Sequence, residues 1–208
     1  MISLTVISQY LISTIGSLGY LGIFFLMAIE STIFPLPSEL VLIPAGFLAF
    51  QGQMSIPLII ILSTLGSLFG SLIMYYLSFV LGRKSFIGLT NKYGKFLFLK
   101  SSLLIKTENY FKNHGPITIF VSRLLLVIRH LISIPAGFAK MKLSSFILYT
   151  ALGSLIWSTV LVYFGYYLGS LGIGSDKANV TPIVISLALF CLVLVILYII
   201  AKRLIKKG

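Results

Sequence analysis

The chain has 208 residues, of which 58% are hydrophobic and 10% charged, and its mean hydropathy is +1.08. A soluble domain carries about 25% charged residues, so this composition excludes an ordinary soluble protein and indicates an all-α integral membrane protein. Long continuous apolar runs argue against a membrane barrel, whose strands are short and alternating. The formal charge of +12 is not spread over the chain, because all basic residues lie at or after Arg83. It therefore gives no indication of nucleic-acid binding.

Residues 1–18 form an apolar N-terminal segment without Lys or Arg, which argues against a cleaved signal peptide with a basic start. Three later runs are long enough to cross a bilayer, which takes about 20 residues. They cover residues 56–82, 143–169 and 180–201. We predict a single membrane domain over residues 1–208.

The connector between the first two of these spans, residues 83–114, is rich in Lys and aromatic residues. Residues 102–113 have their apolar positions on one helical face, which predicts an amphipathic helix in the headgroup layer. Its Lys residues either set the orientation or recognise anionic lipid. Basic residues gather on the cytoplasmic side of membrane proteins, so we predict that this connector and the basic C-terminal tail are both cytoplasmic.

The apolar stretch between His114 and Lys140 has to agree with that topology. The second and third spans carry the chain out and back, so this stretch must enter and leave the membrane on the cytoplasmic side. We predict a re-entrant hairpin near residues 116–138. Pro135 and Gly137, close to its end, are typical of a broken helix.

An internal repeat is visible in the sequence, because Ile-Pro-Ala-Gly-Phe stands at residues 43–47 and again at 134–138. Each copy precedes a span that starts with Leu-Gly-Ser-Leu and ends with Leu-Gly. We predict two copies of a hairpin plus a span, over residues 19–82 and 115–169, with the first hairpin near residues 29–48. A unit that crosses once inverts the next copy, so the hairpins should enter from opposite sides. Inverted repeats are typical of transporters, although they also suit a static protein.

Charged residues lie in both hairpins: Glu30 and Glu39 in the first, Arg123 and Arg129 in the second. An ionised side chain at the bilayer centre costs at least ~2.5 to 3.5 kcal/mol, so the four must pair, line a wet cavity, or both. On an unbroken helix the spacing of the two arginines corresponds to a rotation of roughly 240°. A helix break, or a site that wraps around its ligand, is therefore needed to bring them together.

Pro35 and Pro37 supply a break between the two glutamates, because proline removes a backbone donor and restricts the preceding residue. Arginine stays charged and fits phosphate, whereas a glutamate can be protonated. An anion site beside protonatable acids is what a proton-linked carrier of an anionic substrate requires. His130 is a candidate for a proton relay. The alternative is that the charges form buried ion pairs between the hairpins.

These motifs resemble those of the DedA family, bacterial relatives of the VTT-domain proteins that scramble lipids in eukaryotes. The resemblance rests on E-x-x-x-x-P-x-P-x-E at residues 30–39 with the following Ala-Gly-Phe, and on F-x-x-R-x-x-x-x-x-R with Ser-Ile-Pro-Ala-Gly at 120–137. It extends over roughly residues 19–169. The sequence departs from the family at Leu126, where proline is frequent, and at His130.

The resemblance implies two opposed re-entrant hairpins and a lipid translocase, not an enzyme, in the bacterial cytoplasmic membrane. It implies a polyprenyl phosphate such as undecaprenyl phosphate as substrate, with Arg123 and Arg129 as phosphate-binding residues. Glu30 and Glu39 would be the functional acids, coupled to a proton gradient. No cofactor, metal or nucleic acid is expected.

Other functions remain open. The same hairpins suit a flippase or scramblase for phosphatidylethanolamine or other phospholipids. An intramembrane enzyme would need a nucleophile with a positioned base or a metal cluster, for which two His and the single Cys191 offer little. A static scaffold would use the charges as staples, and predicts that exchanging the charges of Glu39 and Arg123 restores function. The last span is either an anchor or a homo-oligomer interface.

Overall fold

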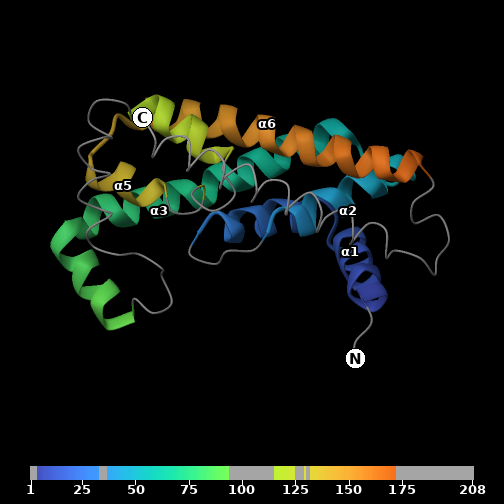
Figure 1. Cartoon of the computed structure of the whole chain (residues 1–208), viewed down its shortest axis with the longest axis horizontal. Coiled ribbons are helices and arrows are strands. Elements are labelled where there is room, and N and C mark those ends of the chain that lie inside the picture. The colour runs from blue at the N-terminus through green and yellow to red at the C-terminus, as the bar shows by residue number, and fades with distance from the viewer. Residues whose placement is uncertain (1–3, 33–36, 94–114, 125–128, 130–131, 172–208) are drawn as a thin grey trace, which may run out of the picture.

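The structure is a computed structural model that describes residues 4–32, 37–93, 115–124, 129 and 132–171. Within these residues all regular secondary structure is helical, which confirms the predicted class for this part of the chain. The helices are α1 (Leu4–Glu30), α2 (Glu39–Phe50), α3 (Ile56–Tyr93), α5 (Ser133–Phe138) and α6 (Leu143–Ser170), with a further helix over residues 115–123. Figure 1 shows α3 and α6 running along the long axis of the molecule.

Two helices are long and apolar enough to cross a membrane, over Ile56–Leu81 in α3 and Leu143–Ser170 in α6. They coincide with the first two predicted spans. Large apolar side chains such as Phe69 on α3 and Tyr163 on α6 are exposed, as expected of surfaces that face lipid. The predicted third span lies outside the described residues, as does the amphipathic segment of the connector.

The first hairpin region consists of the second part of α1 and of α2. α1 bends at Gly19, whose φ of 60° and ψ of −149° are not helical, so that its first part turns away from its second (Figure 1). α2 ends in a Schellman turn, in which Gly52 has a φ of 75° and the Gln53 amide donates to the Leu48 carbonyl at 3.0 Å. α2 therefore stops cleanly before α3 begins.

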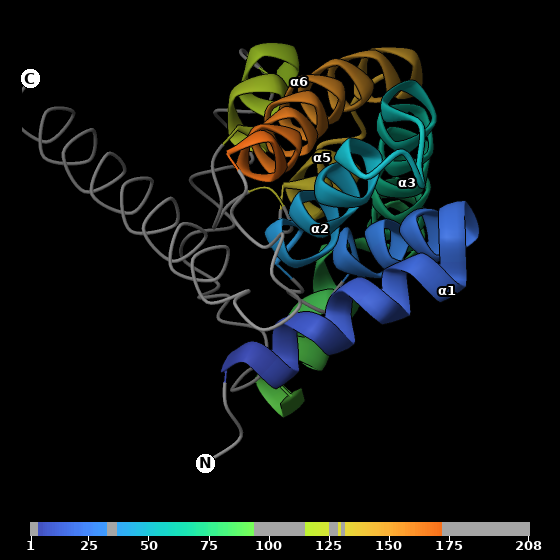
Figure 2. The same cartoon turned by 90° about the vertical axis from the view of Figure 1, so that its right-hand side faces the viewer.

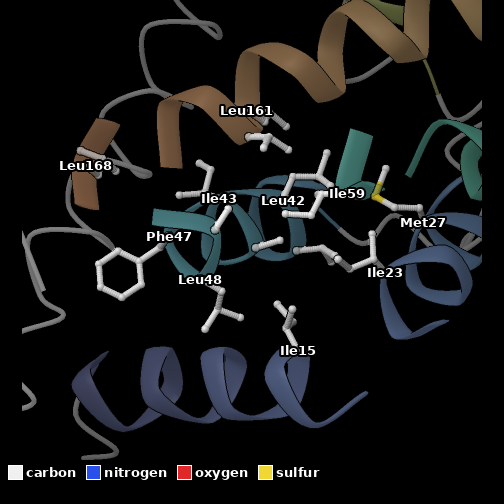
Figure 3. Close-up of a cluster of buried hydrophobic side chains, with 14 of the residues drawn as sticks. Ile15, Ile23, Met27, Leu42, Ile43, Phe47, Leu48, Ile59, Leu161 and Leu168 are labelled. Atoms are coloured by element: carbon white, nitrogen blue, oxygen red, sulfur yellow. The ribbon is translucent and has the colours of Figure 1, made fainter. Parts of the chain in front are cut away.

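The main apolar core surrounds α2, which lies between α1 and α6 (Figure 2). The side chains of Leu48 and Ile15 lie between α2 and α1, whereas those of Ile43 and Leu161 meet between α2 and α6 (Figure 3). α2 is apolar on all sides, and every residue from Val41 to Ala49 is buried. It is thus an internal helix, held away from lipid by its neighbours.

Several glycines lie where the helices of the hairpin regions pack closely against the spans. A Cβ atom on Gly46 of α2 would lie 2.2 Å from the Val162 carbonyl of α6, and one on Gly137 of α5 would lie 2.5 Å from the Tyr75 carbonyl of α3. Each Ile-Pro-Ala-Gly-Phe copy therefore touches the span of the other copy. Conversely, Gly66 of α3 contacts the backbone of α1, and Gly153 of α6 contacts residues 120 and 123.

One expectation about the second hairpin is wrong. Pro135 and Gly137 do not mark a helix break, because both lie inside α5. Pro135 is the third residue of this helix, where a backbone amide has no helical acceptor in any case. Gly137 serves instead as the close contact to α3.

Replacing Gly46 by alanine should weaken the fold, because the new methyl group would overlap the α6 backbone. Overpacking of this kind costs about 1–3 kcal/mol, and α2 cannot move without disturbing α1. Unfolding by SDS in detergent micelles measures the loss. Gly16→Ala is the matched control, since only the Leu48 side chain lies as near as 4.0 Å to its new methyl group. Equal stability of the two variants would contradict the packing described.

Candidate functional site

All four charged residues predicted from the sequence lie in one region. Glu30, Glu39, Arg123 and Arg129 have exposed fractions of only 2%, 0%, 4% and 5%. Three of them, Glu30, Arg123 and Arg129, line a small cavity between the two hairpin regions, α3 and α6. Its volume is about 10 Å³, which leaves room for roughly one water molecule.

Arg129 is the charge that joins the two hairpin regions. Its Nη2 atom lies 2.7 Å from Glu30 Oε1 and 3.8 Å from Glu39 Oε1. Glu30 is the last residue of α1 and Glu39 the first of α2, and both carboxylates face one guanidinium. The N-terminus of α2 also favours the negative charge of Glu39.

Ser38 and Trp157 complete the surroundings of Arg129. Ser38 stands at the start of α2, but its hydroxyl does not cap the helix. It accepts hydrogen bonds from Arg129 Nη2 at 2.7 Å and from Trp157 Nε1 at 3.2 Å. The guanidinium carbon of Arg129 lies 5.3 Å from the centre of the Trp157 ring, a cation–π distance. Trp157 is thus a wall of the site contributed by α6.

Arg123 is held in a different way. Its Nη1 donates to Ser67 Oγ at 3.4 Å, and its Nη2 donates to Ser71 Oγ and to Ser133 Oγ, the latter at 3.4 Å. In the described part of the chain no carboxylate oxygen lies within 4.0 Å of this guanidinium, and its Nε has no hydrogen-bond partner. We call Ser67, Ser71 and Ser133 the serine seat of Arg123.

Hydroxyl groups connect the two arginine sites. Ser31 Oγ donates to Glu30 Oε2 at 3.3 Å and lies 2.7 Å from Ser67 Oγ, which in turn lies 3.3 Å from Ser154 Oγ. Ser67 and Ser154 occupy the same position in the two Leu-Gly-Ser-Leu sequences. Equivalent residues of the two copies therefore meet at the centre of the site.

The site as a whole is a buried polar centre in an apolar protein. Two carboxylates and two guanidiniums balance in charge, and serine hydroxyl groups accept hydrogen bonds from both guanidiniums. Glu39 Oε2 and the Nε atoms of both arginines have no partner among the described residues. Groups of three or more His, Cys, Asp or Glu that could hold a metal ion are absent from the same residues. Guanidinium groups are donors whose planar fork matches carboxylate and phosphate oxygens.

The supporting residues predicted from the sequence divide into two groups. Pro37 precedes α2, and its carbonyl accepts from the Leu40 amide at 3.0 Å. Pro135 and Gly137 lie in α5, the short helix that begins with Ser133 of the serine seat. Pro35 and His130 lie outside the described residues, so their predicted roles are untested.

Sequence reasoning missed the serines and Trp157. Two signals were available for them. Ser67 and Ser71 recur as Ser154 and Ser158 at matching places in the two spans, and polar residues at matching places within apolar helices indicate a shared interior. Trp157 is the single tryptophan of the sequence and takes the place of a glycine, Gly70, in the other copy.

The VTT domain matches residues 36–167 of the chain. An "Alkaline phosphatase-like protein" of Lactococcus lactis subsp. lactis is 37% identical over 206 residues, which cover 96% of this chain and 95% of the relative. "Undecaprenyl phosphate transporter A" of Bacillus subtilis is 32% identical, with 93% of each chain covered. "Protein DedA" of Escherichia coli is 26% identical over 68% of this chain and 64% of the relative. No solved structure matches the chain significantly.

Proposed function

Because the chain belongs to the DedA family of VTT-domain membrane proteins, we propose that it is a translocase for a polyprenyl phosphate such as undecaprenyl phosphate, driven by a proton gradient. The observation that carries this proposal is the buried pair of arginines inside an apolar helical protein. A relative covered over nearly its whole length bears the name of an undecaprenyl phosphate transporter, which supports the choice of lipid.

The small volume of the cavity supports an alternating mechanism. Room for about one water molecule is too little for a phosphate group, so the headgroup can bind only when the hairpin regions separate. The Arg129 contacts to Glu30 and Glu39 join those regions. We propose that the headgroup takes the place of these carboxylates at Arg129 while the lipid tail stays in the bilayer.

Proton coupling would follow from the balance of charge. An ionised Glu30 or Glu39 would repel a phosphate group that carries up to about two negative charges. Protonation of one carboxyl group removes that repulsion and releases Arg129 for the phosphate. The membrane potential, worth ~2.3 kcal/mol per charge per 100 mV, would act on any net charge that moves.

An inverted repeat of two re-entrant hairpins fits the packing. Each hairpin packs its first arm on the span of its own copy and its second arm on the span of the other, as the contacts of Gly66, Gly153, Gly46 and Gly137 indicate. The contact between Ser67 and Ser154 is what a two-fold axis between the copies requires. We propose that the connector and the C-terminus face the cytoplasm of a bacterial cell, and that the chain acts without a cofactor.

Translocation of a fluorescent polyprenyl phosphate in proteoliposomes, with and without an imposed proton gradient, tests the proposal. The wild-type protein should move the lipid faster with the gradient. Phosphate release is measured in the same vesicles, because some relatives are named alkaline phosphatase-like. Release of phosphate would indicate an enzyme, and movement of phosphatidylethanolamine alone would indicate a different lipid substrate.

Glu30→Gln should abolish the effect of the gradient, because the amide cannot exchange a proton. Translocation by this variant is expected at one rate, whether or not a gradient is imposed. Ser63→Ala serves as the control, since Ser63 is equally buried but bonds only the Ile60 carbonyl of its own helix, at 3.0 Å. A Glu30→Gln protein that still responds to the gradient like wild type would remove Glu30 from the coupling step.

A further inference from the structure

In the part of α3 whose side chains are described, residues 56–81, four serines are buried, and their hydroxyl groups make different contacts. Serine in an apolar helix usually bonds a carbonyl of the preceding turn. Ser71 and Ser78 both do so, at 2.6 Å to the Ser67 carbonyl and 2.7 Å to the Met74 carbonyl, and both are 0% exposed. Ser71 also accepts a hydrogen bond from Arg123, whereas Ser78 has no hydrogen bond to a charged side chain among the described residues. Ser71 and Ser78 are therefore matched in burial and in their helix hydrogen bond, and differ in the contact of Ser71 with Arg123.

The serine seat leaves part of the Arg123 guanidinium available. An arginine has five N–H donors. Ser71 and Ser133 take both N–H groups of Nη2, and Ser67 takes one of Nη1. Among the described residues no acceptor is found for the Nε–H or for the second Nη1–H, and Arg123 lines the cavity. The seat therefore holds a buried cation with neutral acceptors while two donors stay unused.

The two arginines of the site are thus in different states. Arg129 is engaged by Glu30 and Glu39, whereas Arg123 has no carboxylate within 4.0 Å among the described residues. Burial of an arginine without a carboxylate is costly unless hydrogen bonds compensate it. Hydroxyl groups meet that need without neutralising the charge, which remains in place to attract an anion.

We propose that Ser71, with Ser67 and Ser133, is a positioning residue that orients Arg123 for a phosphate monoester and keeps it from pairing with Glu30. This rests on the proposed function, and it specifies which arginine meets the phosphate first. Without the Ser71 hydroxyl, Nη2 keeps only the 3.4 Å contact to Ser133. The guanidinium can then turn toward the carboxylate side of the cavity, where it no longer presents its unused donors.

Trp157 makes this measurable without transport. It is the single tryptophan of the chain, it lines the same cavity as Arg123, and it lies against Arg129. Its fluorescence therefore reports binding in the full-length protein in detergent micelles. The probes are a short-chain polyprenyl phosphate, the polyprenol of the same length, and inorganic phosphate. The polyprenol shows how much of the response comes from the lipid tail alone. Inorganic phosphate shows whether the site also binds phosphate without a lipid tail.

Polyprenyl phosphate should change the emission of wild type and Ser78→Ala at the same half-saturating concentration. Ser71→Ala should need about tenfold more, the loss expected when a hydrogen bond to a charged group is removed. The response to polyprenol should be the same in all three proteins, so the preference for phosphate over alcohol falls only in Ser71→Ala. If Ser71→Ala also binds inorganic phosphate tenfold more weakly than wild type, the role of the serine seat is supported, but its ligand is then free phosphate.

Three results would overturn the inference: equal affinities of Ser71→Ala and Ser78→Ala for the phosphate lipid, equal weakening of phosphate and alcohol in Ser71→Ala, or no response of wild type to either phosphate. Failure of the proposed function looks different. A wild-type protein that binds polyprenyl phosphate through the seat, but does not move it in vesicles, would contradict translocation and leave the serine seat supported.

Discussion

Arg123→Ala is expected to abolish translocation of polyprenyl phosphate while the protein still inserts and folds. The variant removes the one guanidinium of the site that is not engaged by a carboxylate, and leaves Glu30 and Glu39 with Arg129. Hydrogen bonds to charged groups contribute about 1.5–3 kcal/mol each, so the loss of two unused donors should slow transport by at least about 100-fold. Initial rates in proteoliposomes measure it.

Arg123→Lys is the more demanding control for this prediction. Lysine keeps the charge but not the planar fork, and a single ammonium cannot reproduce the contacts to Ser67, Ser71 and Ser133. Its transport should stay closer to that of the alanine variant than to wild type. Wild-type rates in Arg123→Ala, at equal protein content of the vesicles, would remove Arg123 from the mechanism.

Arg129→Ala should instead destabilise the protein, by about 3–5 kcal/mol. Arg129 is the cation in contact with both Glu30 and Glu39, which are completely buried, so its removal leaves two carboxylates facing each other across the site. Unfolding by SDS in micelles gives the difference. Arg123→Ala, unfolded in parallel, should lose clearly less because its partners are neutral hydroxyls.

A double variant tests the cause. Arg129→Ala combined with Glu30→Gln also removes the carboxylate that lies nearer to Arg129 in the wild type, and should recover a large part of the lost stability, but not transport. This is a double-mutant cycle, and contacting residues in such cycles show coupling of 0.5–3 kcal/mol. Strictly additive losses would show that the 2.7 Å contact between Arg129 and Glu30 carries little energy. The static-scaffold alternative predicts that exchanging the charges of Glu39 and Arg123 restores function, whereas a carrier would stay inactive after that exchange.

The sequence predicted the structure best where the bilayer restricts which backbone structures are possible. A bilayer offers the backbone no hydrogen-bond partners, so a long apolar run must form a helix, and the helices at Ile56–Leu81 and Leu143–Ser170 follow. The same rule drew attention to Glu30, Glu39, Arg123 and Arg129, because charges in such a chain must meet inside. The helix over residues 115–123 ends before Arg129, as the spacing of the arginines required.

Proline was a less reliable guide. Pro135 was expected at a break, yet it lies within the first turn of α5, and Pro44 lies within α2. A proline near a helix start removes only a donor that has no partner, so its presence alone does not locate the break. The serine seat could not be predicted from local sequence, because Ser78, which bonds a carbonyl of its own helix, has the same local sequence signature as Ser71. Only the comparison of the two copies separates them, since Ser71 recurs as Ser158 whereas Ser78 is matched by Gly165.

The contact between Ser67 and Ser154 has a consequence for how such a protein can be encoded. Two identical copies of the first half, paired in the same way, would bring four carboxylates together, two from each copy, with no cation to balance them. Two copies of the second half would bring together only guanidiniums. An interior that contains both signs of charge and is neutral overall therefore needs two halves with different sequences, one that supplies the carboxylates and one that supplies the guanidiniums. Joining both in one polypeptide fixes them in a one-to-one ratio and lets each half specialise in one charge.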